Sequence, residues 1–198
     1  MKRQYKDASF DGRSLYGKAL AGDSWQSCSF RSADLTEAHI TGCSFADCDF
    51  RGAALNLCRV SGSSFVNCRF DGANLFMASF ASSRLMGCDF SGAATGGLSF
   101  GACDLSYSVL SYLTLDGADL SGCILRGAAL AGCSLRKADL TDCDLREAGL
   151  RAADLREAAL LRCSCEGCDL TDARLAGARI DIPFALYFAA FHGMTPEA

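Results

Sequence analysis

Four cysteines near the end of the chain have a spacing that could hold a metal ion. Cys163, Cys165 and Cys168 lie within six residues of one another, and Cys143 lies twenty residues before the first of them. Four thiolates arranged in this way could bind zinc. All four, however, occupy inward-facing positions of a five-residue repeat that runs along the chain. We therefore predict that they are packing residues, and we expect neither a metal nor a cofactor.

Catalytic chemistry finds less support in the residue types. The two histidines, His39 and His192, lie near opposite ends of the chain, so no Cys-His or Ser-His-Asp set assembles easily. The glycine-rich stretch 92–101 lacks the Lys-Ser/Thr pair of a phosphate-binding loop. The acids Asp119 and Asp139 are expected on a flat outer wall rather than in a cleft. We predict that the protein is not an enzyme.

The dominant feature of the chain is a large apolar residue at every fifth position from Tyr5 to Ile180. We call these 36 positions centres, and among them only Thr95 and Cys165 depart from this rule. A period of five fits neither an α-helix nor a flat strand. A spacing that never slips over this length indicates one structural unit repeated along an axis.

The residues around each centre indicate how the unit is built. The residue two places before a centre is small, and the one directly before it is often Asp, Ser or Asn. Side chains two apart on an extended segment share a side, so the small residue and the centre both point inward. Sixteen of the 20 glycines lie two places after a centre, where the chain must turn.

Several of these units resemble the A(D/N)LXX signature of the pentapeptide-repeat family. The matching segments are Ala33-Asp34-Leu35, Ala118-Asp119-Leu120, Ala138-Asp139-Leu140 and Ala153-Asp154-Leu155. The resemblance implies an all-β fold, a right-handed quadrilateral β-helix with four pentapeptides in each coil of 20 residues, and about nine coils. Columns of like residues 20 apart support it independently, because like stacks on like in a solenoid. One such column is Phe10, Phe30, Phe50, Phe70 and Phe90.

Composition favours a reduced, intracellular protein. Twelve of the thirteen cysteines occupy the small inward position, and stacked neighbours about 4.8 Å apart approach poorly for disulfides. No run of residues is apolar enough to span a membrane, and Met1 to Lys6 lack the apolar stretch of a secretory signal. We expect a cytoplasmic protein with no membrane contact.

Two interruptions of the pattern predict local changes of structure. Thr95 is a polar centre, and Leu98 and Leu113 put large side chains at the small position. We expect a distorted coil between residues 95 and 115.

The chain leaves the repeat after residue 181. We therefore divide it into a β-helix over 1–181 and a C-terminal capping and dimerisation helix plus tail over 182–198. Asp181 can cap this helix and Gly193 can end it. The helix is apolar on more faces than a cap requires, so we predict a twofold homodimer joined at the C-terminal ends. The predicted interface residues are Phe184, Leu186, Tyr187, Phe188 and Phe191.

Charge is uneven along the chain. Residues 1–100 carry ten Lys and Arg against nine Asp and Glu, whereas residues 101–198 carry nine against fourteen. This acidic balance argues against direct binding of nucleic acid and for a basic partner. The candidate acidic patch comprises Asp104, Asp116, Asp119, Asp139, Asp142, Asp144 and Glu147.

An unbroken repeat, an aromatic C-terminal helix and an acidic rod resemble the pentapeptide-repeat proteins that target topoisomerases, the mycobacterial fluoroquinolone-resistance protein and the plasmid-borne Qnr group. The segments 175–181 and 188–193 are similar to the end of the mycobacterial type. The resemblance implies a DNA mimic that binds DNA gyrase, inhibits supercoiling and confers fluoroquinolone resistance. The chain lacks the protruding loops of Qnr members. The alternative is a general interaction or structural rod with another partner, because a repeat alone does not specify function.

Overall fold

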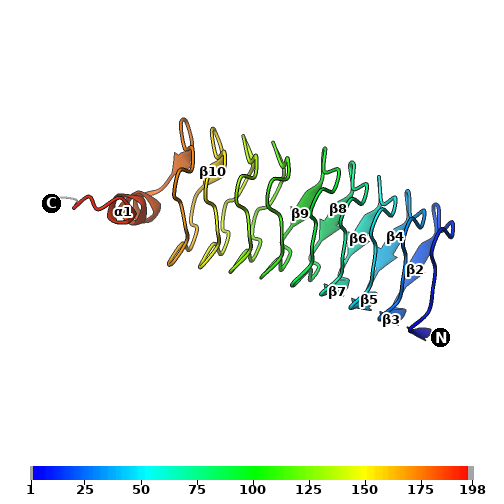
Figure 1. Ribbon diagram of the computed structural model, residues 1–198. Coiled ribbons are helices and arrows are strands. Elements are labelled where there is room, and N and C mark those ends of the chain that lie inside the picture. The colour runs from blue at the N-terminus through cyan, green and yellow to red at the C-terminus, as the bar shows by residue number, and fades with distance from the viewer. Residues whose placement is uncertain (1, 196–198) are drawn as a thin grey trace.

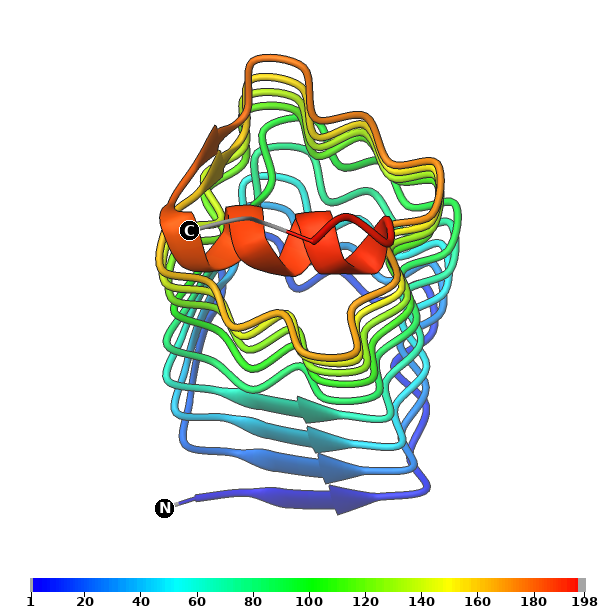
Figure 2. The same cartoon turned by 90° about the vertical axis from the view of Figure 1, so that its left-hand side faces the viewer.

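The computed structural model describes residues 2–195 and shows a solenoid of about nine coils that is closed at one end by a short helix (Figure 1). Each coil has four sides, which Figure 2 shows in projection along the axis. We name the first to fourth faces after the centres Tyr5, Phe10, Leu15 and Leu20, and the corner after each face takes the same number. The right-handed quadrilateral β-helix predicted from the sequence is confirmed.

Parallel pairing between residues 20 apart joins each coil to the next. The paired residues Tyr5 and Trp25 on the first face, and Leu20 and Ile40 on the fourth, illustrate this register. The strands of the first face are β1 (Gln4–Lys6), β3 (Ser24–Gln26), β5 (Ser44–Ala46) and β7 (Ser64–Val66). Those of the fourth face are β2 (Ala19–Ala21), β4 (His39–Thr41), β6 (Arg59–Ser61), β8 (Ser79–Ala81), β9 (Ser99–Gly101), β10 (Ala159–Leu160) and β11 (Arg179–Ile180). Isolated parallel bridges connect the remaining sides.

Large centres and small inward residues fill the core together. The rings of Phe30 and Phe50 stack with centroids 4.7 Å apart, and those of Phe50 and Phe70 follow at 5.0 Å. Each residue thus packs on its counterpart in the neighbouring coil, which is the geometry that a 20-residue column requires. Beyond Phe100 leucine takes over the centres, and these leucines are buried up to Leu170.

The turn between faces uses the same backbone conformation at every corner. The second residue after each centre has a positive φ without exception from Asp7 to Gly177. Glycine adopts this left-handed conformation without steric cost, whereas other L-residues are strained in it. This requirement explains why most glycines of the chain share one position in the repeat.

The distortion predicted between residues 95 and 115 is confirmed. On the third face, Asn74 bridges to Ala94, but the next bridge in this column joins Thr114 to Ser134. The Thr95 hydroxyl donates to the Thr114 carbonyl at 2.7 Å, in place of the backbone N–H that makes this bond elsewhere. Leu98 is buried at the small position of the same coil.

Helix α1 (Ile182–Phe191) lies across the C-terminal end of the core (Figure 2). The Asp181 carboxylate accepts a hydrogen bond from the Phe184 N–H at 3.1 Å and so caps the helix. Phe184 is buried against the last coil. The helix covers the core end, and residues 196–198 of the predicted tail lie outside the described residues. Within residues 2–195 no helix has the length and apolar character needed to cross a membrane.

Candidate partner-binding surface

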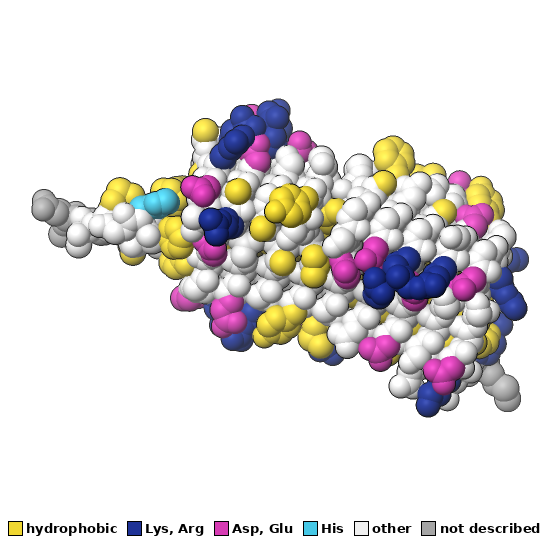
Figure 3. All heavy atoms as spheres, viewed as in Figure 1, with side chains coloured by type: hydrophobic (Ala, Val, Ile, Leu, Met, Phe, Trp, Pro, Cys, Tyr) yellow, Lys and Arg dark blue, Asp and Glu magenta, His cyan; other side chains and the backbone are white. Residues whose placement is uncertain are grey.

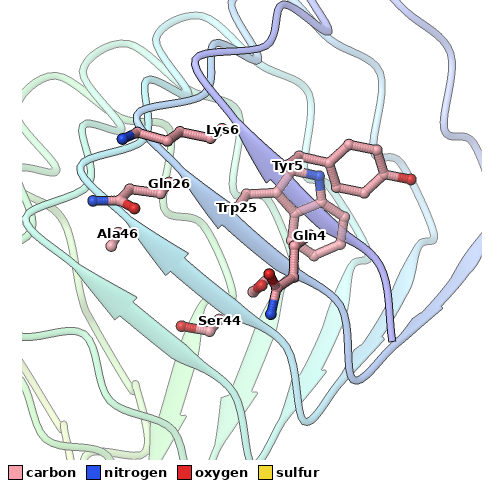
Figure 4. A pocket seen from close by; sticks show the side chains of 8 residues that line it. Gln4, Tyr5, Lys6, Trp25, Gln26, Ser44 and Ala46 are labelled. Atoms are coloured by element: carbon pink, nitrogen blue, oxygen red, sulfur yellow. The ribbon is translucent and has the colours of Figure 1, made fainter. Parts of the chain in front are cut away.

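The walls of the solenoid carry open hollows. One of about 530 Å³ lies on the first face over β1, β3 and β5 (Figure 4). Gln4, Lys6 and Gln26 project on its outer side, while Tyr5 and Trp25 extend inward from the same strands. Lys6 shares this hollow with the hydroxyls of Ser24 and Ser44, and within residues 2–195 no hydrogen bond joins the amine to either serine.

The cysteines of the candidate metal cluster are core residues in the structure. Cys143, Cys163, Cys165 and Cys168 are all buried as free thiols. The thiols of Cys143 and Cys163 donate hydrogen bonds to the carbonyls of Leu120 and Leu140. In the described part of the chain, no three His, Cys, Asp or Glu side chains are grouped so that they could hold a metal ion.

The candidate acidic residues are distributed around three sides of the rod. Asp104 and Asp144 lie on the first face, Asp119 and Asp139 on the fourth, and the remaining three lie at corners: Asp116 at the third, Asp142 at the fourth and Glu147 at the first. None lies on the second face. On the side of the rod that Figure 3 shows, acidic and basic side chains lie next to one another.

Three of these carboxylates already accept hydrogen bonds from arginine side chains. Asp142 accepts two hydrogen bonds from Arg162, at 2.6 and 2.7 Å, and Asp144 is held in the same bidentate manner by Arg146. The arginine partner lowers the pKa of each aspartate. Glu147 is 2.8 Å from Arg126. A partner protein would have to displace these arginines to reach the carboxylates.

Asp104 and Asp116 are engaged less completely. Asp104 accepts from the Ser106 N–H and hydroxyl and lies 3.6 Å from Arg84. Asp116 accepts from the Ser134 hydroxyl and from the backbone N–H of Arg136, without an ion pair to that residue within the described chain.

Among the candidate acids, only Asp119 and Asp139 are bridged directly to each other across neighbouring coils, and both lie on the fourth face. One carboxylate oxygen of Asp119 accepts from the Ser121 N–H and hydroxyl, at 2.9 and 2.6 Å. Asp139 accepts from the Thr141 N–H at 2.9 Å, and the bonds from Thr141 lower its pKa. These bonds hold the two carboxylates in place, and within the described chain no ion pair neutralises either of them.

Sequence reasoning did not anticipate one basic neighbour of this pair. Arg179 occupies the same outward column of the fourth face, two coils beyond Asp139, and its charge also contributes to the lowered pKa of Asp139. The register of 20 residues places Arg179 in this column and could have identified it.

The predicted dimer residues fall on two sides of α1. Phe184 is buried, and the Tyr187 hydroxyl donates to the Cys168 carbonyl at 2.7 Å, so both serve the cap. Leu186 and Phe191 face outward with 48% and 37% of their surface exposed. Phe188 is half-buried against the core and packs on His192. The structure thus leaves an apolar outer side on a helix that already covers the core.

The comparison of the sequence with known families decides the class of the protein. Pentapeptide repeats, in eight copies, match consecutive segments from residue 28 to residue 181: 28–62, 55–92, 83–122, 123–158 and 148–181. The chain belongs to the pentapeptide-repeat family. No curated protein sequence matches this pentapeptide-repeat protein significantly.

Solved structures share the fold of this pentapeptide-repeat protein. A trypsin-treated variant of QnrB1, described as a plasmid-mediated fluoroquinolone resistance protein, is 21% identical and superposes with a TM-score of 0.87 over 100% of both chains. Full-length QnrB1 is also 21% identical, with a TM-score of 0.69 over 96% of this chain and 100% of that chain. At this identity the likeness establishes the fold alone.

Proposed function

We propose that this pentapeptide-repeat protein is a non-enzymatic mimic of DNA that binds DNA gyrase and inhibits supercoiling. The observation that carries the proposal is the pair of unneutralised carboxylates, Asp119 and Asp139, on the flat fourth face of a rod. A basic surface that normally receives DNA phosphates would receive these carboxylates instead. The likeness of the fold to a fluoroquinolone resistance protein supports this assignment, and it extends the proposal to drug resistance.

The dimer is the second element of the proposal. The outer side of α1, with Leu186 and Phe191, would meet the same side of a second copy, because a twofold contact is the simplest closed assembly. A rod of nine coils at sheet spacing is ~43 Å long, and a tail-to-tail dimer is about twice as long. The acidic halves then meet at the middle, in a protein that would act in the cytoplasm, where its thiols stay reduced.

Charge density limits the way in which such mimicry can work. Duplex DNA carries about one charge per 1.7 Å, or roughly 25 over the length of one rod. The formal net charge of this chain is −4. Shape and local placement of carboxylates must therefore replace the overall charge of DNA.

The decisive experiment is a supercoiling and cleavage assay on purified gyrase, with and without ciprofloxacin. We expect inhibition by the wild-type protein and fewer drug-stabilised breaks. The double variant Asp119→Lys/Asp139→Lys should inhibit at least tenfold more weakly. Absence of inhibition by wild-type protein that is folded would refute the proposed function.

A matched control separates local contact from total charge. Asp89 and Asp169 occupy the same position in the repeat on the second face and are held by Ser91 and Thr171 in the same way. The variant Asp89→Lys/Asp169→Lys changes the net charge equally, on the opposite side of the rod. It should retain full inhibition, and equal losses in both variants would contradict a site on the fourth face.

A further inference from the structure

The exposed large apolar side chains in the first half of the rod gather along one edge. Within residues 2–100 they are Tyr16, Leu57, Phe76 and Met77. Each follows a centre of the third face by one or two residues, so all four lie at the third corner. Scattered single apolar residues are normal on a protein surface, but a contiguous group marks an interaction site.

Three of these residues form a continuous projection, which we call the apolar ridge: Leu57, Phe76 and Met77. Their exposed fractions are 41%, 51% and 54%. Leu57 and Met77 occupy the same position in consecutive coils. The next coil has Gly96 and Gly97 at this corner, and a Cβ at either would lie 3.2 Å from Phe76 or Met77. The glycines therefore leave room for the ridge to lie along the corner.

The backbone of the ridge is in an unfavourable conformation for its side chains. Leu57 has φ of 59° and Met77 has φ of 54°. Glycine, asparagine or aspartate adopt this region at lower cost than a bulky apolar residue. Exposure to water and left-handed backbone both disfavour Leu and Met here.

A hollow beside the ridge adds a charged group to the surface. It has a volume of about 330 Å³ and is lined by Leu57, Met77, Arg59, His39 and Glu37. Within residues 2–195 no carboxylate lies within ion-pair distance of Arg59. The hollow combines the apolar side chains of Leu57 and Met77 with the polar groups of Glu37, His39 and Arg59.

The ridge lies on the same side of the rod as the candidate acidic pair. Arg59 and Ser79, each two residues after a ridge residue, belong to the outward column of the fourth face. Asp119 and Asp139 continue this column. Met77 and Asp119 are two coils apart along the axis, or roughly 10 Å at sheet spacing.

We propose that the apolar ridge is the hydrophobic anchor of the same gyrase contact, an inference that rests on the proposed function. A few large side chains, often aromatic, provide most of the affinity of protein interfaces, while charged groups mainly provide orientation and rate of association. A net charge of −4 cannot supply the affinity of DNA, so an apolar anchor supplies the missing part. The gyrase surface then presents basic side chains to Asp119 and Asp139 and a large apolar side chain roughly 10 Å away.

The test is the variant Leu57→Asn/Met77→Asn. Asparagine accepts the left-handed backbone better than Leu or Met, so the variant should fold at least as well as wild type. The matched control is Tyr107→Asn, because Tyr107 has φ of 59°, is 57% exposed and lies at the diagonally opposite first corner. Gyrase affinity should fall about tenfold or more in the double variant and stay within twofold in the control.

The outcomes separate this inference from the function on which it rests. If wild-type protein neither binds nor inhibits gyrase, both fail. If wild type binds and the ridge variant binds within twofold of it, the function stands and the ridge is not an anchor. Dissociation of the dimer in the ridge variant, measured by sedimentation, would show a contact between copies and would also overturn the inference.

Discussion

The thiol of Cys143 donates a hydrogen bond to the carbonyl oxygen of Leu120 in the preceding coil, at an Sγ–O distance of 3.0 Å. Cys133 and Leu110 are related in the same way at 3.1 Å. The Leu120 carbonyl oxygen also accepts a hydrogen bond from the Cys123 N–H, so the Cys143 thiol bonds to the second lone pair of that oxygen. Cysteine at the small position therefore packs the core and links neighbouring coils, which alanine cannot do.

Cys143→Ala should lower the free energy of unfolding by about 1–2 kcal/mol, because it removes a buried sulfur and a hydrogen bond. Cys143→Ser should cost less, since a serine hydroxyl at this position can donate to a carbonyl of the preceding coil, as Ser63 does to Ile40. Urea denaturation of the three proteins measures both effects. Equal losses for Ala and Ser would show that the thiol acts through packing alone.

The buried thiols predict that stability falls in alkaline solution. Burial raises the pKa of Cys133 and Cys168 to about 12 and that of Cys103 to about 11. As pH rises past the ordinary value of 9.0, thiols ionise in the unfolded chain before they ionise in the folded one. The contribution of the protonated thiols to the free energy of unfolding is therefore complete below pH 9. It is lost progressively up to about pH 12, by up to about 1.4 kcal/mol per pH unit for each thiol.

Urea denaturation between pH 7.5 and 10.5 tests this dependence. The variant Cys133→Ala/Cys168→Ala should start from a lower stability but decline less steeply with pH. Parallel declines in variant and wild type would assign the alkaline loss to other groups. Native thiols should also resist a disulfide reagent at pH 8 until the protein unfolds.

Corner glycines should differ in their tolerance of a side chain. A Cβ on Gly117, with φ of 68°, meets no atom within 4 Å, so Gly117→Ala should cost only the left-handed backbone, about 1 kcal/mol. A Cβ on Gly132 would lie 2.6 Å from the ring of Tyr112, so Gly132→Ala should cost more. The double variant Gly132→Ala/Tyr112→Ala should not show this extra cost. Thermal denaturation of the single and double variants measures it, and additive losses would contradict the predicted clash.

Neutral substitutions should distinguish free from paired carboxylates in gyrase inhibition. Asp119→Asn/Asp139→Asn and Asp142→Asn/Asp144→Asn change the net charge equally. Arg162 and Arg146 already occupy the second pair, so only the first double variant should lose direct contacts with a partner. We expect a loss of about tenfold for the first and less than threefold for the second. Equal losses would indicate a general field rather than local contacts.

The two sides of α1 should separate assembly from folding. Leu186→Asp places a charge on the exposed side and should yield a folded monomer in analytical ultracentrifugation. Phe184→Ala removes a buried ring and should lower stability by about 3 kcal/mol instead. A Leu186→Asp protein that remains dimeric would place the interface elsewhere.

The sequence by itself determined the register of the repeat and, with it, the inside and outside of every coil. A large residue every fifth position, a small residue two before it and a turn two after it leave one way to bury the apolar set. Even the exception is readable, because Thr95 and Leu98 break the pattern at the point where pairing between coils is lost. The same register places Leu57 and Met77 at one corner, although burial had to show how far they are exposed.

Only the tertiary structure decided which charged groups neutralise one another. Asp142 pairs with Arg162 across coils, whereas Asp144 pairs with Arg146 within one coil. Both arginines have long, flexible side chains that reach several acids. The repeat therefore predicts where each arginine lies but not which carboxylate it pairs with. The sequence also left open which side of α1 faces the core, because the helix lies beyond the repeat and the five-residue register does not continue into it. Packing against the last coil selects Phe184 for the inside and leaves Leu186 outside.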